Sequence, residues 1–334
     1  MKKSVLFVVL AFNFALAYCA RAPKWVDDVE AEYPRETYIA RLGSGTTAEN
    51  AQASAVGQIA SFFKSEVVVN TNATQNLRND GAKTEKRQEI DQRVQVVSDM
   101  SLTAVEYNTP YYDKRKKTWF VVAYIERVQG FQAVSAQVHS LRARYDSFLE
   151  LARKTEESLL RYKYLVKARE TGEELLSALN MGFLFDSSKK GDYKDFVSEL
   201  NGNEELGTLD SFRVPVFVES RGDYENTITS KIVEALKSCG LSPSYDRKKS
   251  GDAILSIQID SNEKSSDEIC TVYPEVSVTL LSAGGEKTFY SWQHSWGKTA
   301  AFSLSGAQKK AFPKIAEEVK SSLPADFVEK FLMK

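Results

Sequence analysis

The stretch YIARLGSGTTAENAQASAVGQIASFF, residues 38–63, decides the fold of the N-terminal half. Residues 38–42 are typical of a short strand, which ends at the glycines of 43–45. Thr46 or Thr47 can then cap a helix that runs to about Lys64, because a threonine oxygen accepts a hydrogen bond from the first turn. Apolar residues at helical spacing give that helix a stripe made of Ala51, Ala55, Ile59, Phe62 and Phe63.

Residues 43–48, GSGTTA, also match the G-x-G-x-x-[GA] pattern of dinucleotide-binding folds. That fold needs further parallel strand–helix units, whereas this chain continues into alternating strands of the antiparallel kind. We therefore expect no cofactor here and interpret the glycines as a tight turn into a helix that packs closely on its sheet.

Further extended stretches are predicted to complete the N-terminal sheet. Residues 67–71 are predicted to be extended, and residues 89–107 alternate apolar with polar side chains, as in a half-buried antiparallel strand. Residues 119–125 are another strand, and Asp113-Lys114-Arg115-Lys116-Lys117 is the turn before it. We interpret the four cations of this turn as a solvated hairpin tip rather than a phosphate site.

From residue 130 to about residue 180 the apolar spacing becomes helical. A single helix of about 50 residues would be roughly 75 Å long, so the segment is predicted to fold back near residues 154–158 as a helical hairpin. The polar stretch 186–211, rich in Gly, Ser, Asn and charge, is the predicted linker.

The C-terminal part has the predicted order β-α-β-β-β-α, with a short extra strand near 242–245. Ser303 or Ser305 can begin the last helix, in which Pro313 allows a kink or a late start. The other predicted elements are strands at 214–218, 253–259, 272–280 and 289–296 and a helix at 224–238. The expected fold class is α+β, with two small antiparallel-sheet domains that carry helices on one face and are joined by a long helical hairpin.

The first residues are predicted to be an export signal, because Lys2 and Lys3 precede an apolar run over 5–17 that is too short to span a membrane. Two cleavage sites compete. The sequence LAYC, 16–19, is similar to a bacterial lipobox and would leave an acylated Cys19 at the mature N-terminus. Cleavage after Ala17 would instead release a soluble chain.

Composition excludes several classes of function. With 44 Lys+Arg against 45 Asp+Glu, the net charge is -1, so no global basic field gathers nucleic acid. Two histidines, His139 and His294, and three cysteines cannot supply a tetrahedral zinc site. The sequence contains no G-x-S-x-G, H-E-x-x-H or P-loop motif and no carboxylate pair placed for acid–base chemistry. We expect no catalytic residue, no cofactor, no enzymatic activity and no zinc or other metal, while a metal held by carboxylates alone stays formally open.

Cys239 extends the apolar stripe of the helix 224–238, and Cys270 shares the parity of Val272 and Val276. Both are therefore predicted to face one core. Either a disulfide or two buried thiols would suit that placement in an oxidising compartment.

Tyr290, Trp292, His294 and Trp296 alternate along the sequence, so a strand places all four on one face. An exposed face of this kind would bind sugar rings or a partner's apolar patch, and a buried one would be ordinary core.

The N-terminal half resembles a family of bacterial lipoproteins. PKW at 23–25, YIARLGSG at 38–45, the alanine-rich helix and WFVVAYI at 119–125 are similar to the Lpp-twenty family and to the related N-terminal domain of the flagellar assembly protein FlgT, over residues 23–128. From residue 214 the element order is similar to the small domain of TolB's N-terminus, LpoB and CsgG. The resemblance implies envelope adaptors without catalytic residues.

The predicted organisation is a signal peptide (1–18), a lipidated flexible tether (19–34), an Lpp-twenty-like domain (35–128), a helical hairpin (129–185), a linker (186–211) and a TolB-N/LpoB-like domain (212–334). The expected function is a non-enzymatic adaptor or assembly factor, anchored in the outer membrane by the lipid on Cys19 and contacting envelope proteins. The alternative is a soluble periplasmic or secreted protein that binds glycan or another ligand.

Overall fold

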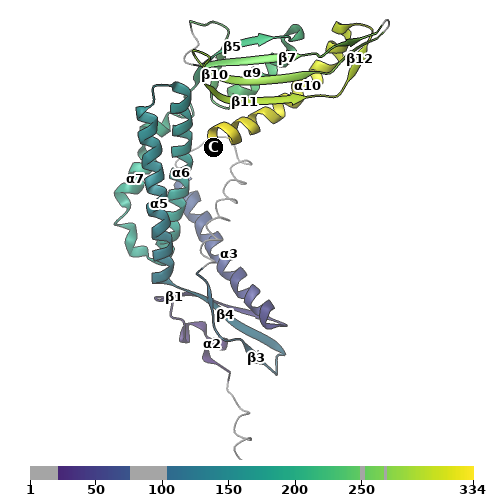
Figure 1. Cartoon of the computed structure of the whole chain (residues 1–334). Helices are drawn as coiled ribbons and strands as arrows, with labels where there is room; N and C mark the ends of the chain where they lie inside the picture. Colours follow the sequence, from purple (N-terminus) through teal and green to yellow (C-terminus); the bar gives the residue numbers. More distant parts are fainter. Residues whose placement is uncertain (1–21, 76–103, 249–252, 267–268) are drawn as a thin grey trace, which may run out of the picture. The chain divides into compact units, whose positions relative to one another are not determined.

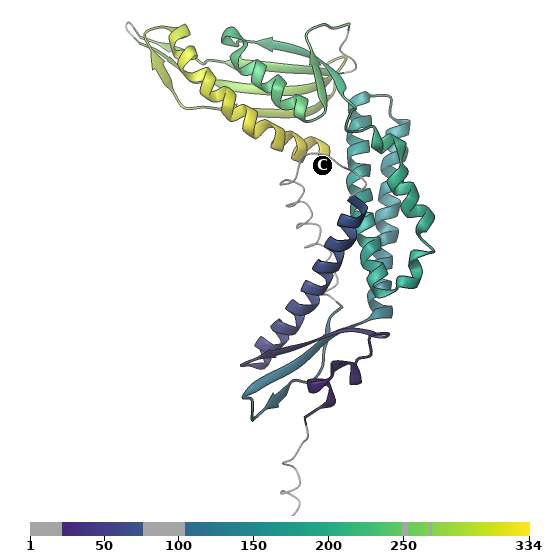
Figure 2. The same ribbon diagram turned by 180° about the vertical axis from the view of Figure 1, so that it is seen from behind.

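The computed structural model describes residues 22–75, 104–248, 253–266 and 269–334, and the chain divides into two compact units. Unit 1 comprises Met1–Leu141 and Glu174–Val197, and unit 2 comprises Arg142–Glu173 and Ser198–Lys334. Figure 1 and Figure 2 show the elements from opposite sides. The long helices α5 (Arg127–Lys154) and α6 (Ser158–Phe185) each contribute residues to both units.

Unit 1 is built on an antiparallel sheet whose central strand is β4 (Thr118–Glu126). On one side β1 (Tyr38–Gly45) pairs with the whole of β4, and on the other side β2 (Glu106–Tyr107) and β3 (Tyr111–Asp113) pair with parts of it. The predicted strand 119–125 and the turn before it are confirmed. Most of the predicted strand 89–107 lies outside the described residues.

Helix α3 (Ala48–Gln75) packs on one face of this sheet (Figure 1) through Ala51, Ala55, Ile59 and Phe63, all fully buried. Its cap is Thr47, whose Oγ1 accepts a hydrogen bond from Asn50 N at 3.2 Å. The prediction that residues 67–71 are extended is wrong, because they belong to α3. A valine costs only a few tenths of a kcal/mol in a helix, and residues 58–75 contain no Gly or Pro to end it.

The N-terminal segment covers the opposite face of the same sheet. It forms α2 (Lys24–Asp27) and the short helix η1 (Val29–Ala31), and it buries Trp25 and Val26 against Val122 of β4. The prediction of a flexible tether as far as residue 34 is therefore wrong from residue 24 onward. Burying an indole removes a large apolar area from water, which offsets the entropy lost in ordering a few residues.

The predicted helical hairpin is confirmed, with α5 and α6 separated by residues 155–157. Within unit 1, Arg127 at the start of α5 donates from Nη1 to Leu184 O at 2.5 Å, and this contact satisfies a carbonyl of the last turn of α6. The predicted linker 186–211 contains η2 (Ser187–Lys190), α7 (Lys194–Gly202) and α8 (Glu204–Gly207). Side-chain caps from Asp186 and Asn203 allow η2 and α8 to form in a polar sequence.

Unit 2 carries a five-stranded sheet of order β11-β10-β7-β5-β6. The two strands β6 and β7 both run parallel to β5, whereas β7, β10 and β11 are antiparallel. The α+β class is confirmed, but this sheet is mixed rather than antiparallel. The reason is the crossover helix α9 (Thr227–Ser238), which returns the chain in the direction of β5. The strands are β5 (Val214–Arg221), β6 (Leu241–Ser244), β7 (Ala253–Asp260), β10 (Glu275–Ser282) and β11 (Thr288–Ser295).

Helices α9 and α10 (Leu304–Phe327) lie on the same face of this sheet (Figure 2). Ser303 caps α10, since its Oγ accepts from Gly306 N at 3.1 Å, and Pro313 lies inside the helix. The chain then continues as η4 (Val328–Met333). A second, small sheet of order β12-β9-β8 is made of β8 (Lys264–Ser265), β9 (Cys270–Val272) and β12 (Thr299–Ala301).

Part of α6 is packed against the rest of unit 2. The ring of Tyr162 stacks on Phe212 with centroids 5.9 Å apart, and a Cβ on Gly240 would lie 2.1 Å from the Tyr162 hydroxyl oxygen. Lys167 Nζ also donates to the backbone oxygen of Lys334 at 2.9 Å. Residues 142–173 of the helical hairpin are thus an integral part of unit 2.

Candidate functional surface

In the described part of the chain, the side chains that commonly bind metal ions do not gather at one place. Over residues 22–75, 104–248, 253–266 and 269–334, no group of three or more His, Cys, Asp or Glu side chains is placed to hold a metal ion. His139 is exposed on α5, and His294 is exposed on β11. No helix in these same ranges is long and apolar enough to cross a membrane.

Cys239 and Cys270 are free, buried thiols. Cys239 follows α9, where its Sγ lies 3.7 Å from Ala235 O. Cys270 belongs to β9 of the small sheet rather than to β10, and its Sγ lies 3.3 Å from Glu263 Oε1. The predicted placement of Cys270 on one strand with Val276 is therefore wrong, because the chain changes sheets between Val272 and Glu275. Burial raises the pKa of both thiols, which keeps them protonated and unreactive at neutral pH.

Three of the four alternating residues of the C-terminal part form an aromatic row, which we define as Trp292, His294 and Trp296. The ring centroids are 6.0 Å apart for Trp292 and His294 and 4.6 Å apart for His294 and Trp296. His294 is exposed and the two indoles are half-buried. The fourth residue, Tyr290, is only 4% exposed because Phe327 of α10 covers its ring. Tyr290 therefore belongs to the core and not to a contact surface.

Helix α10 fixes the position of this strand. Trp296 Nε1 donates to Glu318 Oε2 at 2.7 Å, and the Tyr290 hydroxyl donates to Asp326 Oδ1 at 2.6 Å. Burial, and then the hydrogen bond to Asp326, raise the pKa of Tyr290, so this contact persists across the physiological range. The aromatic row is thus held in place from both ends, which lowers the entropy cost of binding.

The backbone edge next to the row pairs with no described strand. Among the described strands, β11 is the outermost member of its sheet. Its sequence, TFYSWQHS, contains no charged residue and no proline. Soluble proteins usually place Lys or Pro on an edge strand to prevent pairing with other chains. An unprotected edge beside aromatic side chains is suited to the addition of a partner's strand.

Sequence reasoning did not identify a second exposed apolar feature, the pair Phe302 and Ile269. Phe302 is 93% exposed and Ile269 is 47% exposed. The register Ala301 opposite Cys270 puts both at the same end of the small sheet. A residue just before a helix cap usually packs on the fourth helical residue. Here that residue is Ala307, which is too small to hold a phenylalanine ring. The spacing of Phe302 and Ala307 around the cap is therefore a sequence signal that could have revealed the exposure of Phe302.

The predicted solvated hairpin tip is confirmed in unit 1. All four side chains from Lys114 to Lys117 are exposed. Asp113 Oδ1 accepts from Arg115 N at 2.8 Å and from Lys116 N at 3.1 Å, and these bonds hold the pKa of Asp113 below its usual value. Lys117 has a left-handed φ of 52° that closes the turn. The tip is therefore a defined structure that presents cations.

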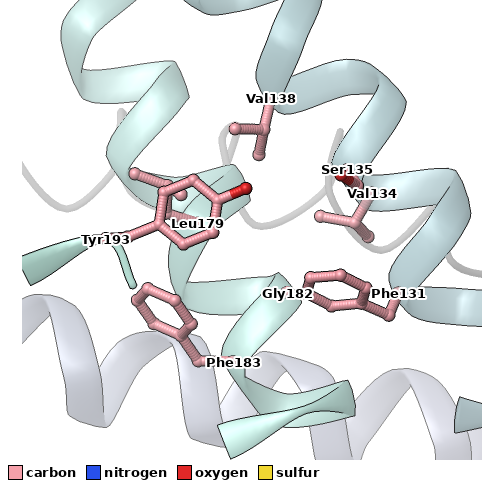
Figure 3. A pocket seen from close by; sticks show the side chains of 8 residues that line it. All are labelled: Phe131, Val134, Ser135, Val138, Leu179, Gly182, Phe183 and Tyr193. Atoms are coloured by element: carbon pink, nitrogen blue, oxygen red, sulfur yellow. The ribbon is translucent and has the colours of Figure 1, made fainter. Parts of the chain in front are cut away.

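A small apolar pocket lies between α5, α6 and the segment before α7 (Figure 3). Its cavity volume is about 10 Å³, roughly what one water molecule needs. The lining is almost entirely apolar, so the pocket is a packing defect and not a ligand site. It is lined by Phe131, Val134, Ser135, Val138, Leu179, Gly182, Phe183 and Tyr193.

No family model and no curated protein matches the chain. Among solved structures, the secreted protein HP1454 from Helicobacter pylori is similar at 14% identity and a TM-score of 0.38, covering 86% of this chain and 98% of that one. A putative lipoprotein from Caulobacter crescentus CB15 is similar at 11% identity and a TM-score of 0.24, covering 34% and 88%. Lipoprotein GNA1162 from Neisseria meningitidis is similar at 13% identity and a TM-score of 0.18, covering 33% and 97%.

Proposed function

We propose that this chain is a non-enzymatic lipoprotein of the bacterial cell envelope, tethered by acylation of Cys19, that acts as an adaptor between envelope proteins. Its docking surface is the aromatic row of Trp292, His294 and Trp296 together with the open edge of β11. The observation that supports this most is the edge itself, an eight-residue outer strand with neither charge nor proline. Such an edge is an aggregation hazard unless a partner covers it.

The geometry of the rings favours a protein partner over a glycan. A sugar ring stacks on a broad flat aromatic face. Here only Trp292 and His294 are near parallel, at 20°, whereas the ring planes of Trp292 and Trp296 are inclined by 53° and those of His294 and Trp296 by 68°. Inclined rings instead form a notched surface, which suits the alternating side chains of an added strand. Glycan binding by a soluble chain is the second candidate, supported by the carboxylate of Glu318 beside Trp296.

Photo-crosslinking in intact cells tests the adaptor role. A photoreactive amino acid placed at His294 is expected to give one discrete protein adduct, whose identity mass spectrometry then establishes. The Trp292→Ala variant carrying the same probe is expected to lose most of that adduct, because a central aromatic contact contributes about 2 kcal/mol or more to binding.

Tyr245 offers a matched control site. It is 63% exposed and follows β6, at the other edge of the same sheet. A probe there is expected to give no such adduct. Equal adducts from both positions would reject β11 as the docking surface, and a glycan adduct from His294 would favour the second candidate.

Lipidation is tested separately by feeding cells labelled palmitate. Incorporation is expected in the wild-type chain and not in Cys19→Ala. A wild-type mature chain that begins at Tyr18 and carries no label would refute the lipid tether. That result would say nothing about the docking surface, which the crosslinking experiment tests.

A further inference from the structure

The hairpin tip of unit 1 combines cations with aromatic rings. Just below the exposed cations of 114–117, Tyr112 and Trp119 are opposite each other in the register of β3 and β4. Their ring centroids are 5.1 Å apart, and Tyr112 is 39% exposed. Tyrosine and tryptophan prefer the boundary between water and lipid, and lysine and arginine are attracted to anionic headgroups.

The first described helix, α2, lies beside this hairpin. The rings of Trp25 in α2 and Tyr111 in β3 meet edge to face with centroids 6.5 Å apart. Lys24, also exposed, adds another cation there. The N-terminal segment therefore contacts β3, the strand that leads into the basic tip.

The buried Trp25 limits how far this part of unit 1 can be from a lipid on Cys19. Only six residue steps separate Cys19 from Trp25, and six residues span at most about 20 Å. A tether of this length is too short to let the domain reach far into the periplasm. Acylation would keep the basic tip within reach of the bilayer surface.

We propose that the hairpin tip, Lys114 to Lys117 with Tyr112 and Trp119, binds the surface of an anionic lipid bilayer. The partner class follows from charge complementarity and from the aromatic pair at the base of the cations. The biological setting of this contact rests on the proposed acylation of Cys19, which places the tip near the membrane. Lipid and tip together supply the two signals that stable anchoring requires.

Vesicle sedimentation with the full unacylated chain, Cys19→Ala, tests this contact without the lipid. We expect binding to vesicles of equal parts phosphatidylglycerol and phosphatidylethanolamine and none to phosphatidylcholine. The triple variant Lys114→Gln, Arg115→Gln, Lys116→Gln is expected to bind on the order of 100-fold more weakly, because each cation near an anionic surface contributes roughly fivefold. Lys117 is kept because its backbone is left-handed.

The matched control changes three cations elsewhere in unit 1, Lys189, Lys190 and Lys194, to Gln. This control alters the net charge by the same amount as the hairpin-tip variant, and it is expected to retain binding to the anionic vesicles. Raising the salt from about 0.1 M to 1 M is expected to abolish binding, since screening shortens from about 10 Å to 3 Å. Equal loss in both triple variants, equal binding to phosphatidylcholine, or no binding to the anionic vesicles would each overturn the proposal. Because no acyl chain is present, these outcomes are independent of the palmitate result.

Discussion

At Gly43 a single added carbon atom would collide with the backbone of the helix that crosses the strand. A Cβ there would lie 2.1 Å from Ala51 O and 2.4 Å from Ala55 N. Backbone atoms cannot rotate away as a side chain can, so Gly43→Ala is expected to destabilise unit 1 by about 3 kcal/mol. Urea unfolding followed by circular dichroism measures this change.

Gly57 is the matched control on the same helix. A Cβ at Gly57 would have no neighbour within 4 Å. Gly57→Ala is therefore expected to stabilise the chain by about 1 kcal/mol through helix propensity. An unchanged midpoint for Gly43→Ala would show that α3 can move off the sheet without cost.

The ionisation of Tyr124 makes the stability of unit 1 depend on pH in the alkaline range. Its hydroxyl donates to Glu106 Oε2 at 2.9 Å, and this bond, with burial, raises the pKa of Tyr124 to about 12. In the unfolded chain the ordinary value is near 10. The stabilising effect is complete below pH 10 and is lost as the pH rises toward 12, because the unfolded chain releases the proton first.

Alkaline titration of phenolate absorbance measures this pKa, with Tyr124→Phe subtracted from the wild type. Glu106→Gln is expected to move the titration back toward the ordinary value, because it removes the anionic acceptor. An identical titration in Glu106→Gln would mean that the carboxylate does not set this pKa.

Sequence reasoning succeeded at residues whose neighbours along the chain determine their role. The alternation of Trp292, His294 and Trp296 is a local property of a strand, so their common face follows from spacing. Tyr290 has the same parity, yet it is buried because Phe327 of α10 covers it. Which part of a face a helix covers depends on packing between distant segments, and spacing alone does not contain that information.

At the scale of elements, the cap of α10 can be tested directly. Ser303→Ala removes the oxygen that accepts from Gly306 N and is expected to destabilise unit 2 by about 1 kcal/mol. Ser303→Asp keeps an acceptor and is expected to retain stability. Thermal unfolding compares the two, and equal losses would show that the serine acts through something other than capping.

Element type was predictable wherever the apolar period was clear. The hairpin of α5 and α6, the strand β4 and the cap of α10 all follow from spacing and capping residues. Two of the wrong predictions share a cause, since each depended on long-range contact. Residues 24–31 look like a polar tether until β4 supplies Val122 as a surface for Trp25. The parallel pairing of β5 with β6 depends on the path of α9.

At the scale of the whole molecule, the path of the chain determines which fragments of the protein keep their stability. Residues 142–173 belong to the same compact unit as 198–334. A fragment 212–334 lacks Tyr162, which stacks on Phe212 and lies against Gly240 in the full chain. We expect this fragment to unfold at lower urea concentration than unit 2 of the full chain and to bind the dye ANS.

The variant Tyr162→Ala in the full chain should reproduce most of that effect, about 3 kcal/mol, because it empties the same space. A fragment as stable as the full-length protein would show that the helical hairpin contributes nothing to unit 2. Urea unfolding curves of the full-length protein, the fragment 212–334 and the Tyr162→Ala variant make this comparison.

The burial of Trp25 against Val122 also sets an order of events during synthesis. The two residues are 97 positions apart in sequence (122 minus 25), and the N-terminal one leaves the ribosome first. At ordinary translation rates Trp25 waits roughly 5 to 20 s for its strand. During that time the indole of Trp25 stays exposed to solvent and to chaperones, and it can be buried only after β4 has been made.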